Sequence, residues 1–392
     1  MQMTRRLFAL LLFFSAPLFL FSRAQTPEKP ASTSKYIAYI GTYTTKTSSK
    51  GIYAYKFDAE KGQLTSIGAA AETQDPSFLV VHPNGKFLYA VNEIGNFNGG
   101  SNGAVSAFAL DAKTGALKFL NQVSTRGAGP CYISFDKTGA YVLVANYDGG
   151  SIASFPVHED GSLGTVSGFV QHSGSGPNKE RQEGPHAHWI GTSPDNRFAL
   201  AVDLGLDQVL VYGFDAYKGL FTPMLSGFAK VKPGAGPRHL AFHPNGKFAF
   251  VLSEIDSSVT VFSYQAKTGA FSSLQTISTL PADYSGPKEA AEIAVHPSGK
   301  FLYTSNRGHD SIAIFAMDPS KGRLKSLGQV LTGGKTPRHF AIDPTGRYLL
   351  AENEESNNVV VFHIDSATGA LTPTGQTIDV PSPVCITFVA AQ

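Results

Sequence analysis

The stretch HPNGKFLYAVNE, residues 82–93, decides the fold because near copies of it recur along the chain. Its Pro-Asn-Gly turn separates an apolar segment from a second apolar run, a pattern typical of two short strands joined by a tight hairpin. Five copies follow at intervals of 54, 57, 50, 53 and 47 residues. They are DKTGAYVLVANY (136–147), SPDNRFALAVDL (193–204), HPNGKFAFVLSE (243–254), HPSGKFLYTSNR (296–307) and DPTGRYLLAENE (343–354). A period near 50 residues predicts a repeat architecture.

A second hairpin pattern lies between these copies and completes the repeat. It occurs seven times, starting at residues 51, 103, 150, 207, 257, 310 and 357, against six copies of the first pattern. The missing pair is supplied if KYIAYIGTY (35–43) and SPVCITFVA (382–390) combine. Four strands per unit predict an all-β, seven-bladed β-propeller whose last blade is closed by the N- and C-terminal strands. A β-sandwich does not explain the constant period, and a parallel α/β fold requires amphipathic helices that the sequence lacks.

The N-terminus has the pattern of an export signal. Two arginines precede an apolar stretch over residues 7–21, and small residues follow it. A retained membrane anchor is the alternative, but the stretch contains Pro17 and is short for a span of about 20 residues. We therefore predict a periplasmic or extracellular protein. Its parts are a signal peptide (1–24), a linker (25–34) and the propeller domain (35–392).

Composition favours a small-molecule ligand. Thirty-two Lys and Arg residues against thirty Asp and Glu residues give a formal charge of +2, and no basic stripe indicates a nucleic-acid partner. No phosphate-cradling loop with a Gly-Lys-Ser ending is present, so nucleotide binding has no support. Cys131 and Cys385 are too few for a disulfide scaffold. We expect no cofactor, no metal, no membrane contact after signal cleavage, and a monomer.

Strand counting predicts where the polar residues gather. Residues equally far from a hairpin turn lie together at its open end. Arg238 and Glu254 each lie eight residues from the glycine of their turn, so they should be neighbours. The same count places Arg307 beside Ala291 and His188 at the end of its own hairpin. If the first strand of each hairpin is innermost, these ends converge on one mouth of the central channel.

The repeats differ from one another at this mouth, which a purely structural role does not predict. The rim collects the cations and histidines His186, His188, Arg238, His239, Arg307, His309, Arg338 and His339, interspersed with Glu93, Glu254 and Glu354. Convergent cations suit an anionic substrate or a developing oxyanion. A structural ion pair between Arg238 and Glu254 is the alternative. Cys131 also lies at the mouth, but the sequence places no clear base beside it, so a nucleophilic role is disfavoured.

Three motifs resemble a known family. GPHAHWIGTSPDNRFALAVDLGLDQVLVY (184–212), GAGPRHLAFHPNGKFAFVLSEIDSSVTVF (234–262) and SNRGHDSIAIF (305–315) are similar to those of the seven-bladed propeller lactonases. This group includes one type of 6-phosphogluconolactonase and a fungal carboxymuconate cyclase. The resemblance extends from Lys35 to the end of the chain. It implies a metal-independent catalytic site in the channel mouth, carried by His188 in GPHAH, Arg238 in GPRH, Glu254 in LSEIDSS and Arg307 in SNRGHD.

The implied activity is hydrolysis of a sugar or carboxylic-acid lactone, or the reverse cyclisation. Arg238 and Arg307 would bind an anionic group and stabilise the charge on the carbonyl oxygen, and either Glu254 or His188 would be the base. The candidate substrate-binding residues around them are His186, His239, His309 and Arg338. Because phosphorylated sugar lactones are made in the cytoplasm, the export signal favours an unphosphorylated lactone.

Other functions stay open on this fold. A non-catalytic exported propeller that binds a protein or polysaccharide is the main alternative. A redox propeller with a quinone cofactor would require a metal site and aromatic stacking in the channel. The polar segment HSGSGPNKERQEGPHAH, residues 172–188, lies next to the predicted site and is a candidate lid.

Overall fold

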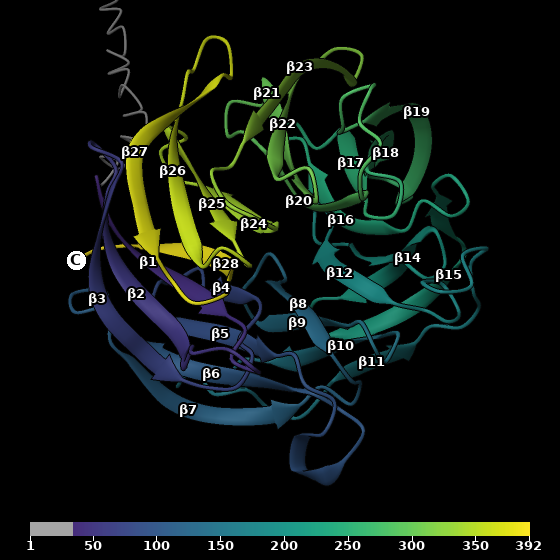
Figure 1. The fold of residues 1–392 in the computed structure, drawn as a ribbon. Helices are drawn as coiled ribbons and strands as arrows, with labels where there is room; N and C mark the ends of the chain where they lie inside the picture. The colour runs from purple at the N-terminus through teal and green to yellow at the C-terminus, as the bar shows by residue number, and fades with distance from the viewer. Residues whose placement is uncertain (1–33) are drawn as a thin grey trace, which may run out of the picture. The chain divides into compact units, whose positions relative to one another are not determined.

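The sequence repeat corresponds to one four-stranded sheet, and seven such sheets lie around a common axis (Figure 1). The computed structural model describes residues 34–392. The predicted signal peptide and residues 25–33 of the predicted linker lie outside that part of the chain. Each sheet is antiparallel, so the predicted seven-bladed architecture is confirmed.

Hairpins built around the first sequence pattern form the two inner strands in six blades, and the chain's two ends form them in the seventh. The innermost strands are β4 (Leu79–Val81), β8 (Pro130–Phe135), β12 (Ala187–Thr192), β16 (Pro237–Phe242), β20 (Glu289–Val295), β24 (Pro337–Ile342) and β28 (Pro383–Ala390). The second strands are β5 (Phe87–Asn92), β9 (Tyr141–Asn146), β13 (Phe198–Asp203), β17 (Phe248–Ser253), β21 (Phe301–Arg307), β25 (Tyr348–Asn353) and β1 (Lys35–Thr42).

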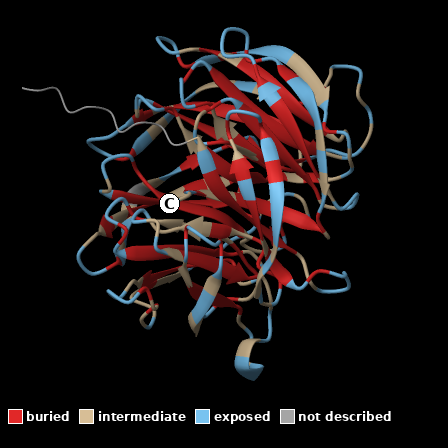
Figure 2. Ribbon diagram, turned by 90° about the vertical axis from the view of Figure 1, so that its left-hand side faces the viewer, coloured by how far each residue is buried: buried red, intermediate tan, exposed pale blue. Residues whose placement is uncertain are grey.

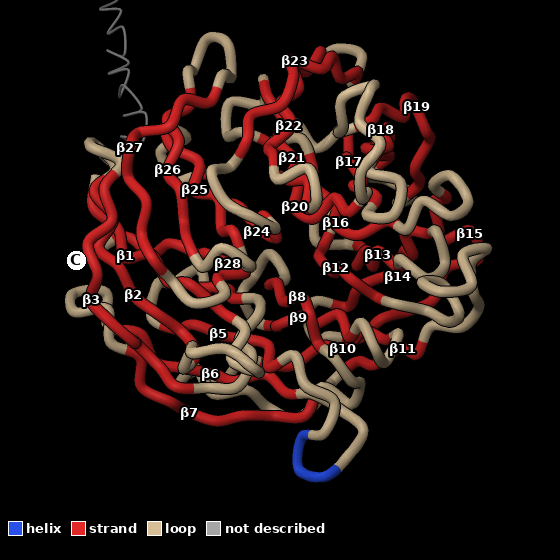
Figure 3. The backbone as a smooth tube through the Cα atoms, in the orientation of Figure 1, coloured by secondary structure: helices blue, strands red, loops and turns tan. Residues whose placement is uncertain are grey.

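The second pattern forms the two outer strands. The third strands are β6 (Ala104–Leu110), β10 (Ser151–Pro156), β14 (Gln208–Asp215), β18 (Ser258–Gln265), β22 (Ser311–Asp318), β26 (Asn358–Ile364) and β2 (Gly51–Asp58). The outermost strands are β7 (Leu117–Ser124), β11 (Gly168–Gln171), β15 (Leu220–Lys230), β19 (Ala270–Ser278), β23 (Arg323–Leu331), β27 (Leu371–Asp379) and β3 (Gln63–Glu72). Strands dominate the tube of Figure 3, and within residues 34–392 the one helix is a single turn, Phe97–Gly99.

The chain's two ends close the ring, as the sequence predicts. β1 pairs with β28 on one side and β2 on the other, giving the sheet order β28-β1-β2-β3. Ile40 lies opposite Ile386 in this ladder, and both side chains are buried. Closure leaves each innermost strand in contact with the innermost strands of both neighbouring blades, all the way around the axis.

Packing between blade faces supplies the core. One cluster joins Phe250 and Leu252 of β17 to Leu302 of β21 and Phe315 of β22, all of them buried. Burying one such side chain stabilises the fold by roughly 1.5–3 kcal/mol. Figure 2 shows the buried residues running along the strands, while outermost strands such as β27 are largely exposed. Among the described residues, none of the helical structure is long and apolar enough to cross a bilayer.

The turn histidines fasten neighbouring blades to each other. The Nδ1 atoms of His82 and His243 accept backbone N–H groups two residues ahead, at 3.1 and 3.0 Å, so these side chains cap the turn. Their Nε2 atoms bond the carbonyl oxygens of Gly139 and Gly299 in the next blade, at 3.1 and 3.0 Å. These histidines therefore have structural roles away from the channel mouth.

A β-bulge near the start of the innermost strand recurs in five blades and shapes the channel mouth. The ladder register shifts between Pro130 and Tyr132, Ala187 and Trp189, Pro237 and His239, Ala290 and Ile293, and Pro337 and His339. A bulge leaves its extra residue unpaired and re-aims the side chains beside it. Cys131, His188, Arg238 and Arg338 are such extra residues. The bulge in β20 also corrects the strand count, since Arg307 lies opposite Glu289 and not opposite Ala291.

Candidate active site

Glu254 is the centre of the polar cluster at the mouth. It follows β17 directly, and its carboxylate is contacted by guanidinium groups from its own blade, from the next blade and from the segment that joins β11 to β12. Arg238 Nε lies 3.1 Å and Arg307 Nη2 lies 2.9 Å from Glu254 Oε2. Arg181 Nη2 donates a hydrogen bond to Glu254 Oε1 at 2.6 Å. Strand counting therefore placed Arg238 and Glu254 correctly side by side.

These contacts fix the charge of Glu254. Burial alone raises the pKa of the carboxyl group, but Arg307, Arg238 and neighbouring groups outweigh burial and hold that pKa far below its usual range. Glu254 is therefore ionised, with one negative charge against three positive ones. Its two oxygens are both occupied by guanidinium nitrogens.

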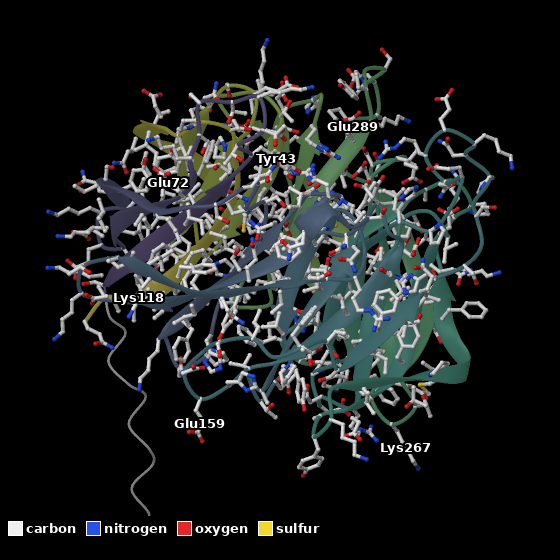
Figure 4. All side chains as sticks on the ribbon, turned by 90° about the horizontal axis from the view of Figure 1, so that it is seen from below. Tyr43, Glu72, Lys118, Glu159, Lys267 and Glu289 are labelled. Carbon is white, nitrogen blue, oxygen red and sulfur yellow. The ribbon has the colours of Figure 1, made fainter. Side chains whose placement is uncertain are left out.

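A cavity of about 260 Å³ opens beside this cluster. It is lined by Tyr43, Glu93, Cys131, Tyr147, Asp148, Arg181, His188, Glu254, Arg307 and Arg338. Figure 4, which views the structure from below Figure 1, shows Tyr43 and Glu289 toward one face and Glu159 and Lys267 toward the opposite one. Tyr43 lines the cavity, and Glu289 pairs with Arg307, which lines it as well. The cavity therefore lies at the face opposite the turns that join the first and second strands of each blade.

His188 is the neutral base candidate on the cavity wall. Burial, followed by the charges of Arg238 and His239, lowers the pKa of His188 well below the usual histidine value. Its Nδ1 atom lies 3.6 Å from Cys131 Sγ. Because Nδ1 faces this sulfur, Nε2 is the nitrogen left for the cavity. At neutral pH the ring keeps an unprotonated nitrogen that can accept a proton.

Cys131 has a histidine beside it, which the sequence did not indicate. Burial, reinforced by Glu93, raises the pKa of the Cys131 thiol well above its usual value. The thiolate is the nucleophilic form of cysteine. Cys131 is therefore held as a neutral thiol that packs against the His188 ring, and Cys385 is free and buried as well.

Arg238 lies beneath the cavity and is not part of its lining. It borders a separate void of about 10 Å³, together with His239, Glu292 and His339. Burial, followed by Arg338 and Arg307, lowers the pKa of Arg238 to about 10, so the side chain stays cationic at neutral pH. Arg238 therefore acts on the cavity through Glu254 and through its charge.

A buried chain of titratable groups leads from Arg238 in β16 across β20 and β24 to β25. Arg238 Nη1 donates to His239 Nε2 at 3.2 Å, because a guanidinium group can only donate. Nη1 also lies 3.5 Å from His239 Nδ1, and that nitrogen lies 3.0 Å from Glu292 Oε2. Glu292 Oε1 accepts the backbone N–H of Ile293 at 2.9 Å. Burial raises the pKa of Glu292 above its usual range, although the charges of His339 and Arg238 act in the opposite direction.

The far end of this chain requires a protonated carboxyl group. His339 Nε2 lies 3.5 Å from Glu292 Oε2, and His339 Nδ1 lies 2.6 Å from Glu352 Oε2. Burial, reinforced by the charge of Glu292, raises the pKa of Glu352 well above its usual value. A neutral Glu352 donates to His339 Nδ1, and its Oε1 can stay buried without a partner at less cost than a carboxylate oxygen.

Glu352→Gln is expected to become more stable relative to wild type as pH rises. Because the pKa of Glu352 is raised in the folded protein, the folded state holds a proton that the unfolded chain releases above about pH 4.3. Wild-type stability therefore falls with rising pH in this window, by about 1.4 kcal/mol per pH unit, and the variant lacks this loss. Urea unfolding at pH 5, 6, 7 and 8 measures the difference.

The exposed neighbour provides the control for that measurement. Glu355→Gln removes a carboxylate three residues after Glu352, at an exposed position in the turn that follows β25. Its difference from wild type should stay constant across the same pH range. A constant difference for Glu352→Gln as well would mean that Glu352 is ionised in the folded protein.

The opposite side of the cavity has its own ion pair. Arg338 Nη2 lies 3.9 Å from Glu93 Oε1, and the Arg338 guanidinium lies over the Tyr43 ring, 5.2 Å from its centroid. The Tyr43 hydroxyl donates to Glu93 Oε2 at 3.0 Å. Excess positive charge is therefore concentrated on the Glu254 side of the cavity.

The structure brings together most of the predicted site residues. His188, Glu254, Arg307 and Arg338 line the cavity, and Arg238 and His239 lie directly beneath it. The other two predicted binding residues contact structural partners and do not line it. His186 stacks on Tyr147 and lies 3.2 Å from Glu183. His309 lies 2.7 Å from Ser311 Oγ and against the Tyr284 ring.

Sequence reasoning missed four charged residues of this site, one of which is Asp148 of the cavity lining. Arg181 lies inside the polar segment 172–188, and only its contact with Glu254 distinguishes it from the other charges there. Glu292 and Glu352 lie inside strands β20 and β25. A carboxylate within an apolar strand is a usable signal for a buried polar network. Within residues 34–392 no cluster of three or more His, Cys, Asp or Glu side chains is arranged to hold a metal ion.

Comparison with known proteins adds independent findings. Residues 37–388 match the protein family described as "Lactonase, 7-bladed beta-propeller". The chain is 40% identical over 355 residues to a 6-phosphogluconolactonase of Bacillus subtilis (strain 168), covering 91% of this chain and 99% of that protein.

Two solved structures are similar over nearly their whole length. A putative 6-phosphogluconolactonase from Bacteroides fragilis NCTC 9343 has 39% identity and a TM-score of 0.85, covering 92% of this chain and 100% of that one. A periplasmic gluconolactonase from Pseudomonas aeruginosa has 35% identity and a TM-score of 0.85, with the same coverage of 92% and 100%.

Proposed function

The chain belongs to the seven-bladed β-propeller lactonase family, and from this premise we propose that it hydrolyses the ring ester of sugar-acid lactones in the cavity beside Glu254. The family that the sequence motifs indicate is confirmed. Relatives named as lactonases support catalysis and give no support to a non-catalytic binding propeller. The observation that carries the proposal is the cluster of three guanidinium groups on one carboxylate, with neutral His188 on the same cavity wall.

In the proposed reaction Arg307 binds the carbonyl oxygen of the lactone. Its Nη2 atom is buried and has no aligned hydrogen-bond acceptor, although it lies 2.9 Å from Glu254 Oε2. Arg238 Nε is in the same position, but of these two arginines only Arg307 lines the cavity, where a substrate oxygen can reach it. As water attacks, negative charge grows on that oxygen, and the guanidinium group stabilises it without any metal ion.

We assign the role of base to His188 rather than Glu254. Both oxygens of Glu254 are held by guanidinium groups, whereas Nε2 of His188 is not engaged by Cys131. His188 takes a proton from the attacking water as the new C–O bond forms. It returns this proton to the ring oxygen as the ester C–O bond breaks, so the net reaction adds one water molecule. Glu254 orients Arg307, and Arg238 holds Glu254 from below.

Export remains part of the proposal. The predicted signal peptide lies in residues 1–24, and one similar structure is described as a periplasmic enzyme. We therefore place the mature protein in the periplasm or outside the cell, where an unphosphorylated lactone is the expected substrate.

Purified protein lacking residues 1–24 is expected to open glucono-δ-lactone or a related sugar-acid lactone well above the spontaneous rate. The rate should stay within about twofold after treatment with EDTA, because arginines supply the electrophile that a metal supplies in other hydrolases. Titration of the released acid across a panel of sugar and aromatic-acid lactones measures this. Absence of enhancement across the panel would refute lactonase activity, and a loss with EDTA that Zn²⁺ or Mg²⁺ restores would refute metal independence.

A further inference from the structure

Arg181 is the one guanidinium group on Glu254 that lies substantially in solvent. Its side chain is 38% exposed, whereas those of Arg238 and Arg307 are 3% and 11% exposed. Glu254 keeps its ion pairs with Arg238 and Arg307 if Arg181 moves away. The carboxylate therefore does not need Arg181 for its charge to be compensated.

The backbone that carries Arg181 is held in place, while the side chain has few contacts. The neighbouring Gln182 is fully buried and donates to Leu204 O and Asp207 Oδ1, both at 2.8 Å. Within the same segment, the backbone carbonyl of Gln182 accepts the Gly176 N–H at 2.9 Å. Beyond Glu254, the contact described for the Arg181 guanidinium is a long one of 3.4 Å to the Tyr147 hydroxyl.

We infer that Arg181 is a specificity-determining residue that exchanges its contact with Glu254 for a second anionic group on the substrate, a phosphate or carboxylate distal to the ring ester. This inference rests on the proposed lactonase function and narrows its substrate class to lactones that carry such a group, which is a carboxylate if the substrate is unphosphorylated as proposed above. A change of side-chain rotamer is sufficient, because the backbone anchor at Gln182 stays in place.

Electrostatics favours this exchange. The Arg181 side of its pair with Glu254 is 38% exposed, so water screens part of the attraction between the two groups. A guanidinium group binds phosphate or carboxylate through two parallel hydrogen bonds, which is a stronger and more directional contact. The anion also enters the side of the cavity where three arginines face one carboxylate. On the other side, Arg338 is already close to Glu93.

The exchange also implies a sequence of contacts as substrate binds. With the cavity empty, Arg181 covers Glu254 Oε1 and satisfies that oxygen. When an anionic lactone enters, Arg181 contacts the distal anion and leaves Arg307 to the carbonyl oxygen. A neutral lactone offers Arg181 no such partner, so it gains less binding energy from this residue.

The test compares Arg181→Gln with wild type on three probes. These are glucono-δ-lactone, which is neutral, 6-phosphoglucono-δ-lactone, which carries a phosphate, and a glucaric-acid lactone, which carries a carboxylate. We expect kcat/KM for at least one anionic lactone to fall about 10–100-fold more than kcat/KM for the neutral one, mostly through KM. Arg181→Lys should lose less, because it keeps the charge without the two-point contact.

Controls and outcomes separate this inference from the proposed function. Lys179→Gln removes an exposed cation of the same segment that does not line the cavity, and its ratios should match wild type. A preference lost only for the phosphate or only for the carboxylate probe identifies the distal group. Equal losses on all three lactones would overturn the inference, because Arg181 would then serve Glu254 alone.

A wild-type protein that opens none of the three lactones would refute the proposed function. Binding of the open-chain acids would still test the role of Arg181. The calorimetric Kd for at least one of 6-phosphogluconate and glucarate, taken relative to the Kd for gluconate, should rise about 10–100-fold in Arg181→Gln. Unchanged ratios would overturn the role of Arg181.

Discussion

Arg307→Gln is expected to lower kcat for lactone hydrolysis by about 100–1000-fold, with a smaller change in KM. Loss of one donor to a developing oxyanion typically removes about 3 kcal/mol of transition-state stabilisation. Arg307 is the residue concerned because its guanidinium group lines the cavity and holds a buried nitrogen without an aligned acceptor. Glutamine keeps a polar end but no positive charge. Steady-state kinetics on the best lactone of the panel measures the effect.

The fold should survive this substitution. Glu254 retains Arg181 and Arg238 as partners, so no buried carboxylate is left without a countercharge. Arg323→Gln is the matched control, because it removes an exposed arginine at the start of β23, in the same blade. If Arg307→Gln retains more than about a third of wild-type kcat while Arg323→Gln behaves like wild type, the oxyanion assignment is wrong.

His188→Gln is expected to lower kcat/KM by about 100–10,000-fold, the usual contribution of a positioned general base. The pH profile adds a sharper criterion. A base works only when unprotonated, and burial with Arg238 lowers the pKa of His188 well below 6.5. Wild-type activity should therefore stay level through neutral pH and fall only in acid, below pH 6.5. The residual activity of the variant should lack this acidic fall.

A second histidine variant separates catalysis from general effects on the mouth. His309→Gln changes a mouth histidine that bonds Ser311 and does not line the cavity, so both its rate and its pH profile should resemble those of wild type. Circular dichroism and urea unfolding establish that His188→Gln is folded. An acidic fall that persists unchanged in folded His188→Gln would transfer the role of base to another group, with Glu254 the next candidate.

The sequence alone determined the number of blades, the four strands in each and the closure of the ring by β1 and β28. These features are visible because every blade repeats the same local pattern of short apolar strands and glycine turns, and local patterns are what a sequence displays directly. Hairpin counting also located Arg238 beside Glu254, since both residues lie a fixed distance from one turn.

Only the tertiary structure decided which side chains enter the channel and what they contact. Alternation along a strand places consecutive residues on opposite faces, yet the bulge in β16 lets both Arg238 and His239 border the same buried void. The bulge in β20 shifts Arg307 to a position opposite Glu289. The path of residues 172–186 carries Arg181 to a carboxylate 73 positions away. Bulges and loop paths are set by packing between blades. The bulge recurs in five blades, but neither the alternation along a strand nor the spacing of the turns reveals it.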